Sequence, residues 1–209
     1  MSSKAARCGR LIVLSAPSGS GKTTVLAKLL KSEAGVMRSV SVTTRPPRRG
    51  ERSGRDYRFV STARFAKAKR RGEFLECARI LGNWYGTPRK PVEKALRSGR
   101  SVLLGIDIQG ARRLRSSGLP VTTIFLLPPS MGALRRRLRG SGTENAAQIG
   151  AWLRLARREL KELHRYDYAV VNDRLPDAIG AIRTILRAER FRVGGIFDFR
   201  ANGFLKKEV

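Results

Sequence analysis

The sequence predicts an α/β fold with a parallel central sheet covered by helices, an inserted mixed α/β subdomain and a helical lid. Short apolar runs alternate with helical patterns along most of the chain, which is typical of a parallel sheet with helices on both faces. Residues 36–88 interrupt this alternation with antiparallel-looking strands. Residues 128–165 begin at a Pro-Pro pair, contain the glycine-rich stretch 140–143 and end in a long amphipathic helix.

The first βα unit contains a phosphate-binding loop. An apolar strand at 9–16 leads into the loop and a helix at 23–33 follows it; the loop itself is Ala16, Pro17, Ser18, Gly19, Ser20, Gly21, Lys22 and Thr23. Glycines let backbone N–H groups surround phosphate oxygens, Lys22 can reach the β- and γ-phosphates, and Thr23 can ligate Mg²⁺. Ala16 stands where the pattern G-x-x-x-x-G-K-[ST] has its first glycine. A flexible Gly/Ser turn is the alternative, but the flanking strand and helix favour a nucleoside triphosphate site.

The remaining elements follow from periodicity and from Gly and Pro positions. We expect strands at 36–43, 57–61, 73–81, 101–107, 121–127 and 168–172, and a turn at 83–88. We expect helices at 62–71, 91–97, 109–117, 131–139, 145–165 and 177–190. The segment 43–57 is a loop rich in Arg, Pro and Gly, and we expect its prolines and glycines to give it a defined conformation rather than flexibility. The tail from Phe191 has no usable pattern.

Length and composition indicate one globular domain. The chain has 209 residues, of which 41% are hydrophobic, and this is enough for a real core. The longest apolar runs fall well short of the ~20 residues that a transmembrane helix needs. The run after Arg10 is also too short for a signal peptide and leads directly into the phosphate-binding loop. We therefore expect a cytoplasmic protein with no membrane partner. Cys8 and Cys77 lack metal-ligand spacing.

The charge balance is unusually basic, with 44 Lys and Arg against 16 Asp and Glu and a net charge of +28. Such a balance attracts phosphates and nucleic acid. The cations, however, are spread over nearly every segment, and few aromatic residues lie between them to stack bases. Weak nonspecific association with RNA or DNA stays open, whereas a specific nucleic-acid role is disfavoured.

The insert has the residue types of a second phosphate site. Planar guanidinium groups with paired N–H donors are offered by Arg45, Arg48 and Arg55, and hydroxyl donors by Tyr57 and Tyr85. Both kinds of donor suit a terminal phosphate. A solvated basic loop is the alternative on charge alone.

Glu76 lies between apolar residues of a predicted strand, where a carboxylate is costly unless it is paired. It could accept hydrogen bonds from guanine N1–H and N2–H, or it could form a structural salt bridge with an arginine. The residues alone leave both readings open.

Residues 9–190 resemble the guanylate kinase family, which phosphorylates GMP with ATP. The resemblance rests on an unbroken order of motifs: the loop 15–23, Ser41–Arg48 (SVTTRPPR), Gly50-Glu51, Gly54–Tyr57 (GRDY), Phe74-Leu75-Glu76, Gly82–Thr87 (GNWYGT), Ile106–Ala111 (IDIQGA) and Val171-Asn172-Asp173. Many nucleotide-binding proteins share the loop. The Thr-Thr-Arg-Pro-x-Arg and Asn-x-Tyr-Gly-[ST] segments are more specific.

The resemblance implies a P-loop kinase fold with three parts in one domain over 1–209. The core would be 1–35, 96–127 and 166–192, the GMP-binding subdomain 36–95, the lid 128–165 and the C-terminal tail 193–209. ATP with Mg²⁺ would bind at Ala16–Thr23, with Thr24 and with Asn172 near adenine. Arg45, Arg48, Tyr57 and Tyr85 would hold the GMP phosphate, and Ser41, Glu76, Thr87 and Asp107 would read guanine. Lys22, Arg45 and Arg137 would be the catalytic cations, and Thr23 the metal ligand.

Three positions depart from the family pattern. Gly105 replaces an acidic residue, and Ser141 and Trp152 each replace an arginine. Phosphoryl transfer depends on positioning and charge stabilisation, so we expect turnover to be reduced unless a nearby residue such as Arg139 compensates. Two alternatives follow: a guanylate kinase-like binding module with vestigial activity, and a basic nucleic-acid-associated protein. The intact phosphate-binding loop favours an ATP:GMP phosphotransferase over both.

Overall fold

The computed structural model describes residues 9–48, 50–140 and 145–192. Its central element is a five-stranded sheet in which every neighbouring pair of strands is parallel. In spatial order the strands are β2 (Val36–Arg38), β7 (Ser101–Gly105), β1 (Leu11–Ser15), β8 (Val121–Leu127) and β9 (Tyr168–Val171). This confirms the predicted parallel sheet.

Helices cover both faces of this sheet, as its apolar strands require. The core helices are α1 (Lys22–Ser32), α3 (Arg89–Arg97), α4 (Ile108–Arg115) and α7 (Leu175–Ala188). Successive residues of β1 point to opposite faces. Ile12 and Leu14 therefore pack with α1 and α7, whereas Leu11 and Val13 pack with α3 and α4.

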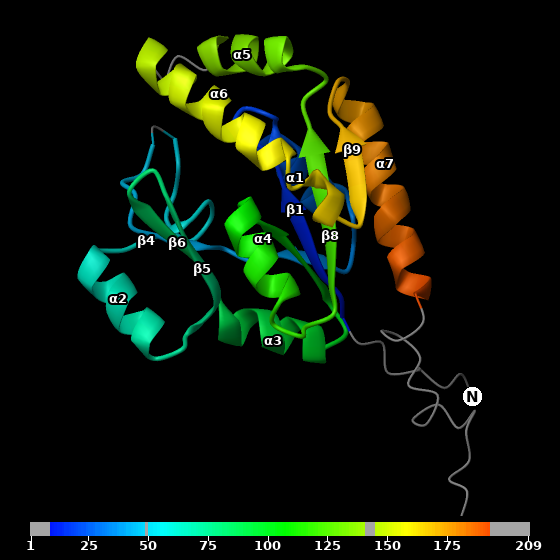
Figure 1. Ribbon diagram of the computed structural model, residues 1–209. Helices are drawn as coiled ribbons and strands as arrows, with labels where there is room; N and C mark the ends of the chain where they lie inside the picture. The colour runs from blue at the N-terminus through cyan, green and yellow to red at the C-terminus, as the bar shows by residue number, and fades with distance from the viewer. Residues whose placement is uncertain (1–8, 49, 141–144, 193–209) are drawn as a thin grey trace, which may run out of the picture.

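A second, mixed sheet forms the insert beside the central sheet, and it carries α2 (Thr62–Arg70) (Figure 1). Its spatial order is β4 (Arg58–Phe59), β3 (Val42–Thr43), β6 (Asn83–Pro88) and β5 (Phe74–Ile80). Phe65 of α2 stacks on Phe74 of β5 and on Trp84 of β6, with ring centroids 4.7 and 5.9 Å apart. This aromatic cluster joins the helix to the sheet.

Two helices, α5 (Met131–Gly140) and α6 (Ala146–Leu160), lie together above the carboxyl ends of the central strands (Figure 1). They share a small apolar core of their own, which includes Leu134, Leu138 and Ile149. Asn145 begins α6 with a capping box, in which its side chain and that of Gln148 each accept from the other's backbone N–H. A short 3₁₀ turn, η1 (Leu163–Arg165), follows α6, so the helix predicted at 145–165 is broken near its end.

Two further predictions of local structure are wrong. Residues 36–43 are not one strand: β2 joins the central sheet and β3 joins the insert, so 36–38 belong to the core sheet rather than to the insert. Residues 83–88 are not a turn but strand β6, paired antiparallel with β5. The turn lies just before them, at Leu81 and Gly82, both with positive φ. A short 3₁₀ turn, η2 (Glu189–Phe191), ends the described chain.

No helix within the described ranges is long and apolar enough to cross a membrane. The predicted cytoplasmic location stays a prediction.

Candidate active site

The phosphate-binding loop is folded tightly between β1 and α1. Gly19 and Gly21 have φ of 85° and 89°, a conformation that costs glycine little and other residues much. Gly21 is also the residue before the first turn of α1, so the backbone N–H groups of that turn face the loop. A side chain at Gly21 would collide with Asn172, whose Nδ2 would lie 2.5 Å from the added Cβ. The loop sequence therefore fixes a site at a helix N-terminus, which is suited to anions.

Lys22 extends from this loop across the end of β7. Its Nζ donates to the Ile106 carbonyl at 2.8 Å. Burial lowers the pKa of Lys22, although Asp107, Glu159 and Glu76 act in the opposite direction. Because burial disfavours the charged ammonium, a negatively charged ligand that binds beside Lys22 would offset this cost.

One cavity of about 440 Å³ joins the loop, the insert, the end of the central sheet and α6. Among the predicted site residues that line it are Ala16, Pro17, Ser18, Gly19, Gly21, Lys22, Thr23, Ser41, Arg45, Arg48, Tyr57, Glu76, Tyr85 and Asp107. Ser20, Thr24, Thr87, Arg137 and Asn172 are not among the lining residues. Most of the residues that line the cavity were therefore predicted from the sequence, although they lie in segments far apart along the chain.

Glu51 organises the arginine loop of the insert. Its carboxylate accepts two hydrogen bonds from Arg45 Nη2, each 2.9 Å, and one from the Arg48 backbone N–H at 2.7 Å. Burial alone would raise the pKa of Glu51, but these hydrogen bonds hold it below its usual value. Arg45 also lies over the Tyr57 ring, with its guanidinium carbon 5.5 Å from the ring centroid. Tyr57 in turn meets Tyr85 edge to face at 6.0 Å. Arg45, Tyr57 and Tyr85 of the predicted phosphate site therefore form one cluster. Arg55 is not part of the cavity wall and pairs instead with Asp56 at 3.0 Å.

Glu76 is the buried acid of the cavity, with 6% of its surface exposed. The Thr87 hydroxyl donates to its Oε1 at 2.6 Å. Burial raises the pKa of Glu76 to about 7, the Thr87 hydrogen bond lowers it, and the neighbouring Asp107 raises it further. The structural salt bridge left open from sequence is absent within the described part of the chain. Asp107 has a second role, since its Oδ1 accepts from the Gly110 N–H at 2.9 Å and caps α4.

Asn172 and Arg137 lie behind the phosphate-binding loop. The Asn172 side chain donates to the Ser20 carbonyl at 2.7 Å, and the Arg137 Nη2 donates to the Asn172 carbonyl at 2.9 Å. Arg137 Nη1 is buried and has no hydrogen-bond partner among the described residues. In this structure the Asn172 amide therefore supports the loop, and Arg137 supports Asn172.

The comparisons with known proteins agree with this geometry. The sequence pattern of the guanylate kinase family matches residues 8–189. The guanylate kinase of Novosphingobium aromaticivorans is 45% identical over 197 residues, covering 92% of this chain and 89% of that protein. The guanylate kinase of Rhodospirillum rubrum is 46% identical over 187 residues, covering 89% and 86%. The crystal structure of guanylate kinase from Anaplasma phagocytophilum superposes with a TM-score of 0.79 at 38% identity, covering 93% of each chain.

The chain belongs to the guanylate kinase family. Its α/β fold with a parallel central sheet is the P-loop fold that this membership implies. The two alternatives, a vestigial binding module and a nucleic-acid-associated protein, are not favoured by these relatives.

Gly105, where the family resemblance implied an acid, lies against the Leu26 side chain of α1. A Cβ added at Gly105 would lie 2.3 Å from Leu26 Cδ1, far closer than carbon atoms approach without strain. The space for an acidic side chain is therefore filled by a core leucine that is only 5% exposed.

Trp152, where the family resemblance implied an arginine, lines the cavity and packs against the apolar core of α5 and α6. The indole therefore contributes to packing of the lid as well as to the cavity wall. Ser141, the third departure, lies outside the described residues.

Glu159 is a cavity residue that the sequence reasoning missed. It lines the wall with Lys22 and Asp107, and its Oε2 is buried without a hydrogen-bond partner among the described residues. Burial raises the pKa of Glu159 to about 7, while Lys22 lowers it and Asp107 raises it. The signal was available, because Glu159 follows Trp152 by seven residues and so lies on the same helical face.

Proposed function

We propose that the protein transfers the γ-phosphoryl group of ATP to GMP and releases ADP and GDP. The observation that carries this proposal is the single cavity with a phosphate-binding loop at one side and the Arg45, Tyr57 and Glu76 cluster at the other. Transfer between two nucleotides needs both phosphates in one water-poor space, held by cations that stabilise the charge of the transferred group. Membership of the guanylate kinase family supports the same reaction.

On the ATP side, the loop N–H groups and Lys22 bind the phosphates. Arg137, held at the Asn172 carbonyl outside the cavity wall, would have to reorient before its guanidinium could reach them. For Mg²⁺ the cavity wall offers the Thr23 hydroxyl. Thr23 is exposed in the first turn of α1, lines the cavity and makes no side-chain hydrogen bond among the described residues. The metal would supply neutralisation of the phosphate charge. Gly105 offers no carboxylate, so Thr23 is the metal ligand that we assign.

On the GMP side, Arg45 and Arg48 hold the phosphate with Tyr57 and Tyr85, while Glu76 accepts from the guanine N1–H and N2–H. Thr87 orients the carboxylate by its hydrogen bond to Oε1. Ser41 and Asp107 complete the wall around the base. Because a carboxylate with two free lone pairs matches guanine and mismatches the unprotonated N1 of adenine, this site selects GMP.

An assay of ADP release, with GMP, AMP, UMP and CMP as separate acceptors, tests the proposal. We expect ADP release that depends on GMP or dGMP and exceeds the rate with each of the other three. Equal rates with all four acceptors, or release that needs no acceptor, would remove the proposed function.

Acidification is expected to weaken GMP binding through Glu76. The pKa of Glu76 in the free protein is about 7, and guanine needs the ionised carboxylate. The affinity should therefore be full above pH 7 and fall by about tenfold for each pH unit below it, until the pKa of the complex is reached. Calorimetric titration of GMP between pH 8 and 5.5 measures this dependence.

The Glu76→Gln variant is the control for that titration. It keeps the second ionisation of the GMP phosphate, near pH 6, but lacks the carboxylate. A variant with the same pH profile as the unmodified protein would assign the whole dependence to the phosphate and none to Glu76.

An acid at Gly105 and an arginine at Trp152 are expected to raise turnover, provided that space for the acid is made beside Leu26. Gly105→Asp alone should overpack against Leu26 and destabilise the fold by about 1–3 kcal/mol. Gly105→Asp with Leu26→Ala removes that clash, and Trp152→Arg adds a guanidinium to the cavity. A charge-stabilising group of this kind typically changes kcat by about 10²-fold, so the combined variant should turn over faster at similar KM for GMP.

Leu26→Ala alone is the matched control, and thermal unfolding of each variant separates lost packing from altered chemistry. If the unmodified protein already turns over at ~1–100 s⁻¹ and the combined variant is no faster, these positions do not limit this protein.

A further inference from the structure

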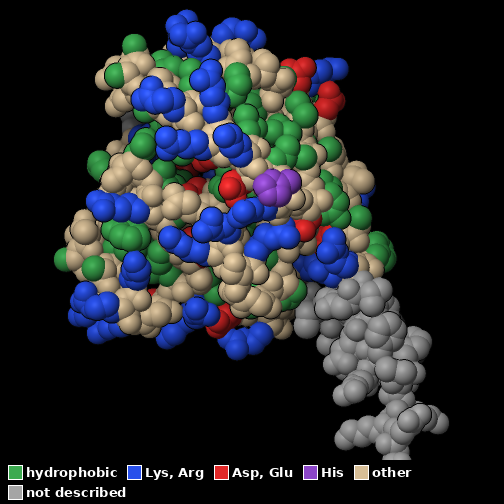
Figure 2. All heavy atoms as spheres, viewed as in Figure 1, with side chains coloured by type: hydrophobic (Ala, Val, Ile, Leu, Met, Phe, Trp, Pro, Cys, Tyr) green, Lys and Arg blue, Asp and Glu red, His purple; other side chains and the backbone are tan. Residues whose placement is uncertain are grey.

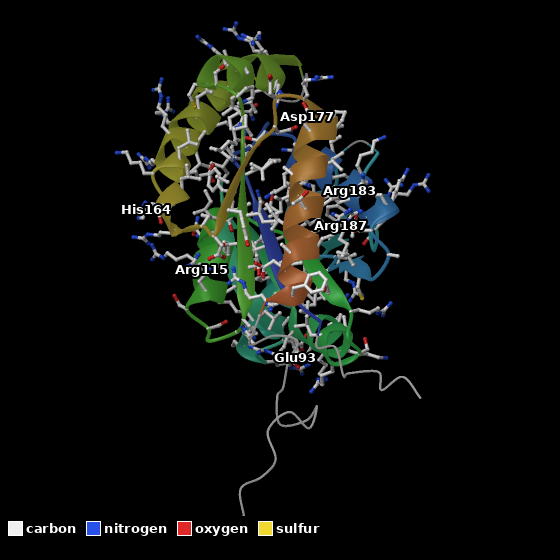
Figure 3. The ribbon with its side chains drawn as sticks, turned by 90° about the vertical axis from the view of Figure 1, so that its right-hand side faces the viewer. Glu93, Arg115, His164, Asp177, Arg183 and Arg187 are labelled. Carbon is white, nitrogen blue, oxygen red and sulfur yellow. The ribbon has the colours of Figure 1, made fainter. Side chains whose placement is uncertain are left out.

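The proposed reaction does not account for the excess of positive charge. The net charge is +28, and many of the arginines are already paired, for example Arg45 with Glu51 and Arg183 with Glu33. Arg115, labelled in Figure 3 near His164, bonds the Arg165 carbonyl and pairs with Asp167 at 3.4 Å. Unpaired cations that gather on one surface therefore need a separate explanation.

Six such cations gather on α4, on α6 and at the residue that directly follows α6, and we call their surface the α4–α6 basic face. Its members are Arg112, Arg113, Arg154, Arg157, Arg158 and Lys161. All six are exposed, and none forms an ion pair or a side-chain hydrogen bond within the part of the chain that the structure describes. Figure 2 shows Lys and Arg side chains crowded over this side of the molecule, with acidic side chains deeper in the hollow between them.

The helix geometry places the four cations at the end of α6 on one stripe. At 100° per residue, Arg157, Arg158 and Lys161 lie within an arc of about 100° that contains Arg154. The buried Ala156 lies on the opposite side of the helix. The stripe is about 10 Å long, and it faces solvent along its whole length.

A hollow of about 360 Å³ separates the two helices of this face. Arg112 and Arg113 line it from α4 and Arg158 lines it from α6. Three acids also line the hollow, namely Asp107, Glu159 and Glu162. All three are half-buried, and Glu162 pairs with Arg165 at 3.2 Å. The rim of the hollow is therefore cationic on both sides, whereas its negative charge is recessed.

We propose that the α4–α6 basic face binds the phosphate backbone of duplex nucleic acid without regard to sequence. Five of the six cations are arginines, whose planar forks match phosphate oxygens. The described residues that line the hollow include no aromatic ring, so the face lacks the stacking platforms that select single strands. A duplex presents one negative charge per ~1.7 Å of axis, and this density suits a stripe of closely spaced cations.

The experiment measures binding of a mixed-sequence DNA duplex of ~20 base pairs to the full chain at several salt concentrations between about 50 and 200 mM. The test variant is Arg154→Gln/Arg157→Gln/Lys161→Gln. A second variant, Arg112→Gln/Arg113→Gln, changes the other border of the hollow. The matched control is Arg64→Gln/Lys67→Gln/Arg70→Gln, which removes three exposed cations of α2 that likewise form no side-chain hydrogen bond or ion pair with any residue in the described ranges. Thermal unfolding checks that each variant is folded.

The slope of log K against log salt should lose about 0.9 for each phosphate contact removed. The α6 variant should therefore lose about 2.7 of slope and the α4 variant about 1.8, whereas the α2 control should lose less than a third as much as the α6 variant. A change of sequence in the duplex should leave all of these slopes unaltered.

Equal losses in the α6 variant and the α2 control would show that attraction is spread over the whole surface, and would overturn the proposal. So would an unmodified protein with no duplex binding at 50 mM salt. Vesicles that contain phosphatidylserine are the third arm. If the α6 variant loses vesicle binding but keeps duplex binding, the face belongs to membranes and the proposal is wrong.

Discussion

The Lys22→Met variant is expected to lose phosphoryl transfer by at least 10²–10³-fold in kcat, the range seen when one group that stabilises the transition state is removed. Lys22 Nζ is the ammonium that the fold brings to the phosphate-binding loop, held by the Ile106 carbonyl at 2.8 Å. Methionine keeps the length and the apolar stem of the side chain but supplies no charge to the transferred phosphoryl group. Steady-state kinetics with saturating ATP and GMP measures the loss.

The free energy of unfolding of the Lys22→Met variant should be equal to that of the unmodified protein or higher. Burial lowers the pKa of Lys22, so the charged side chain is disfavoured in the nucleotide-free protein and its replacement removes a cost. Lys28→Met, on the exposed face of the same helix, is the matched control and should keep full activity. If Lys22→Met is as active as Lys28→Met, the loop does not position the reacting phosphate.

The second large effect concerns Glu76, and it is a change of specificity. Glu76→Gln is expected to lower kcat/KM for GMP by at least 10²-fold and to leave the slow reaction with AMP nearly unchanged. A buried site that hydrogen-bonds its substrate rejects a mismatched partner by about 10⁴–10⁵, and the amide would direct an N–H group at the guanine N1–H. The carboxamide oxygen can still accept from Thr87, so the local fold should survive.

Glu73→Gln is the matched control for this substitution, because Glu73 lies just before the same strand and is exposed. Competition between GMP and AMP in one reaction measures the specificity ratio directly. An unaltered ratio in Glu76→Gln would assign guanine recognition to other groups of the cavity wall.

The phosphate-binding loop and the central sheet could be predicted from sequence because their signals are local. The loop requires glycines at fixed offsets, and each strand of the sheet is a short apolar run between helices. The burial of Glu76 could also be predicted, since its neighbours in the strand are apolar.

Strand β6 was missed because its sequence reads as a turn. It contains Asn83, Gly86 and Pro88, which are depleted in strands. Its formation depends on pairing with β5, and Gly86 is required where the strand passes the aromatic cluster: an added Cβ would lie 2.9 Å from Phe74. Such a requirement involves residues that are distant in sequence, so no local pattern reveals it.

The candidate site, too, could be predicted only in part. The sequence reveals the residue types that suit the two nucleotides, but it does not reveal which side chains pack around these residues. The contact between Gly105 and Leu26 joins β7 to α1. The hydrogen bonds that Glu51 accepts from Arg45 and Arg48 depend on how the loop folds back on itself. Only the folded structure shows that an acid at Gly105 would meet the Leu26 side chain, which must shift or be shortened to make room.

The most direct test follows the transferred group itself. ATP labelled at its γ-phosphoryl group is incubated with the protein and GMP, and the products are separated. The proposed reaction predicts that the label appears in GDP in step with ADP release, and that Lys22→Met slows both by at least 10²–10³-fold. Label released as inorganic phosphate, or left in ATP while the folded protein binds both nucleotides, would contradict a transfer between two sites in one cavity.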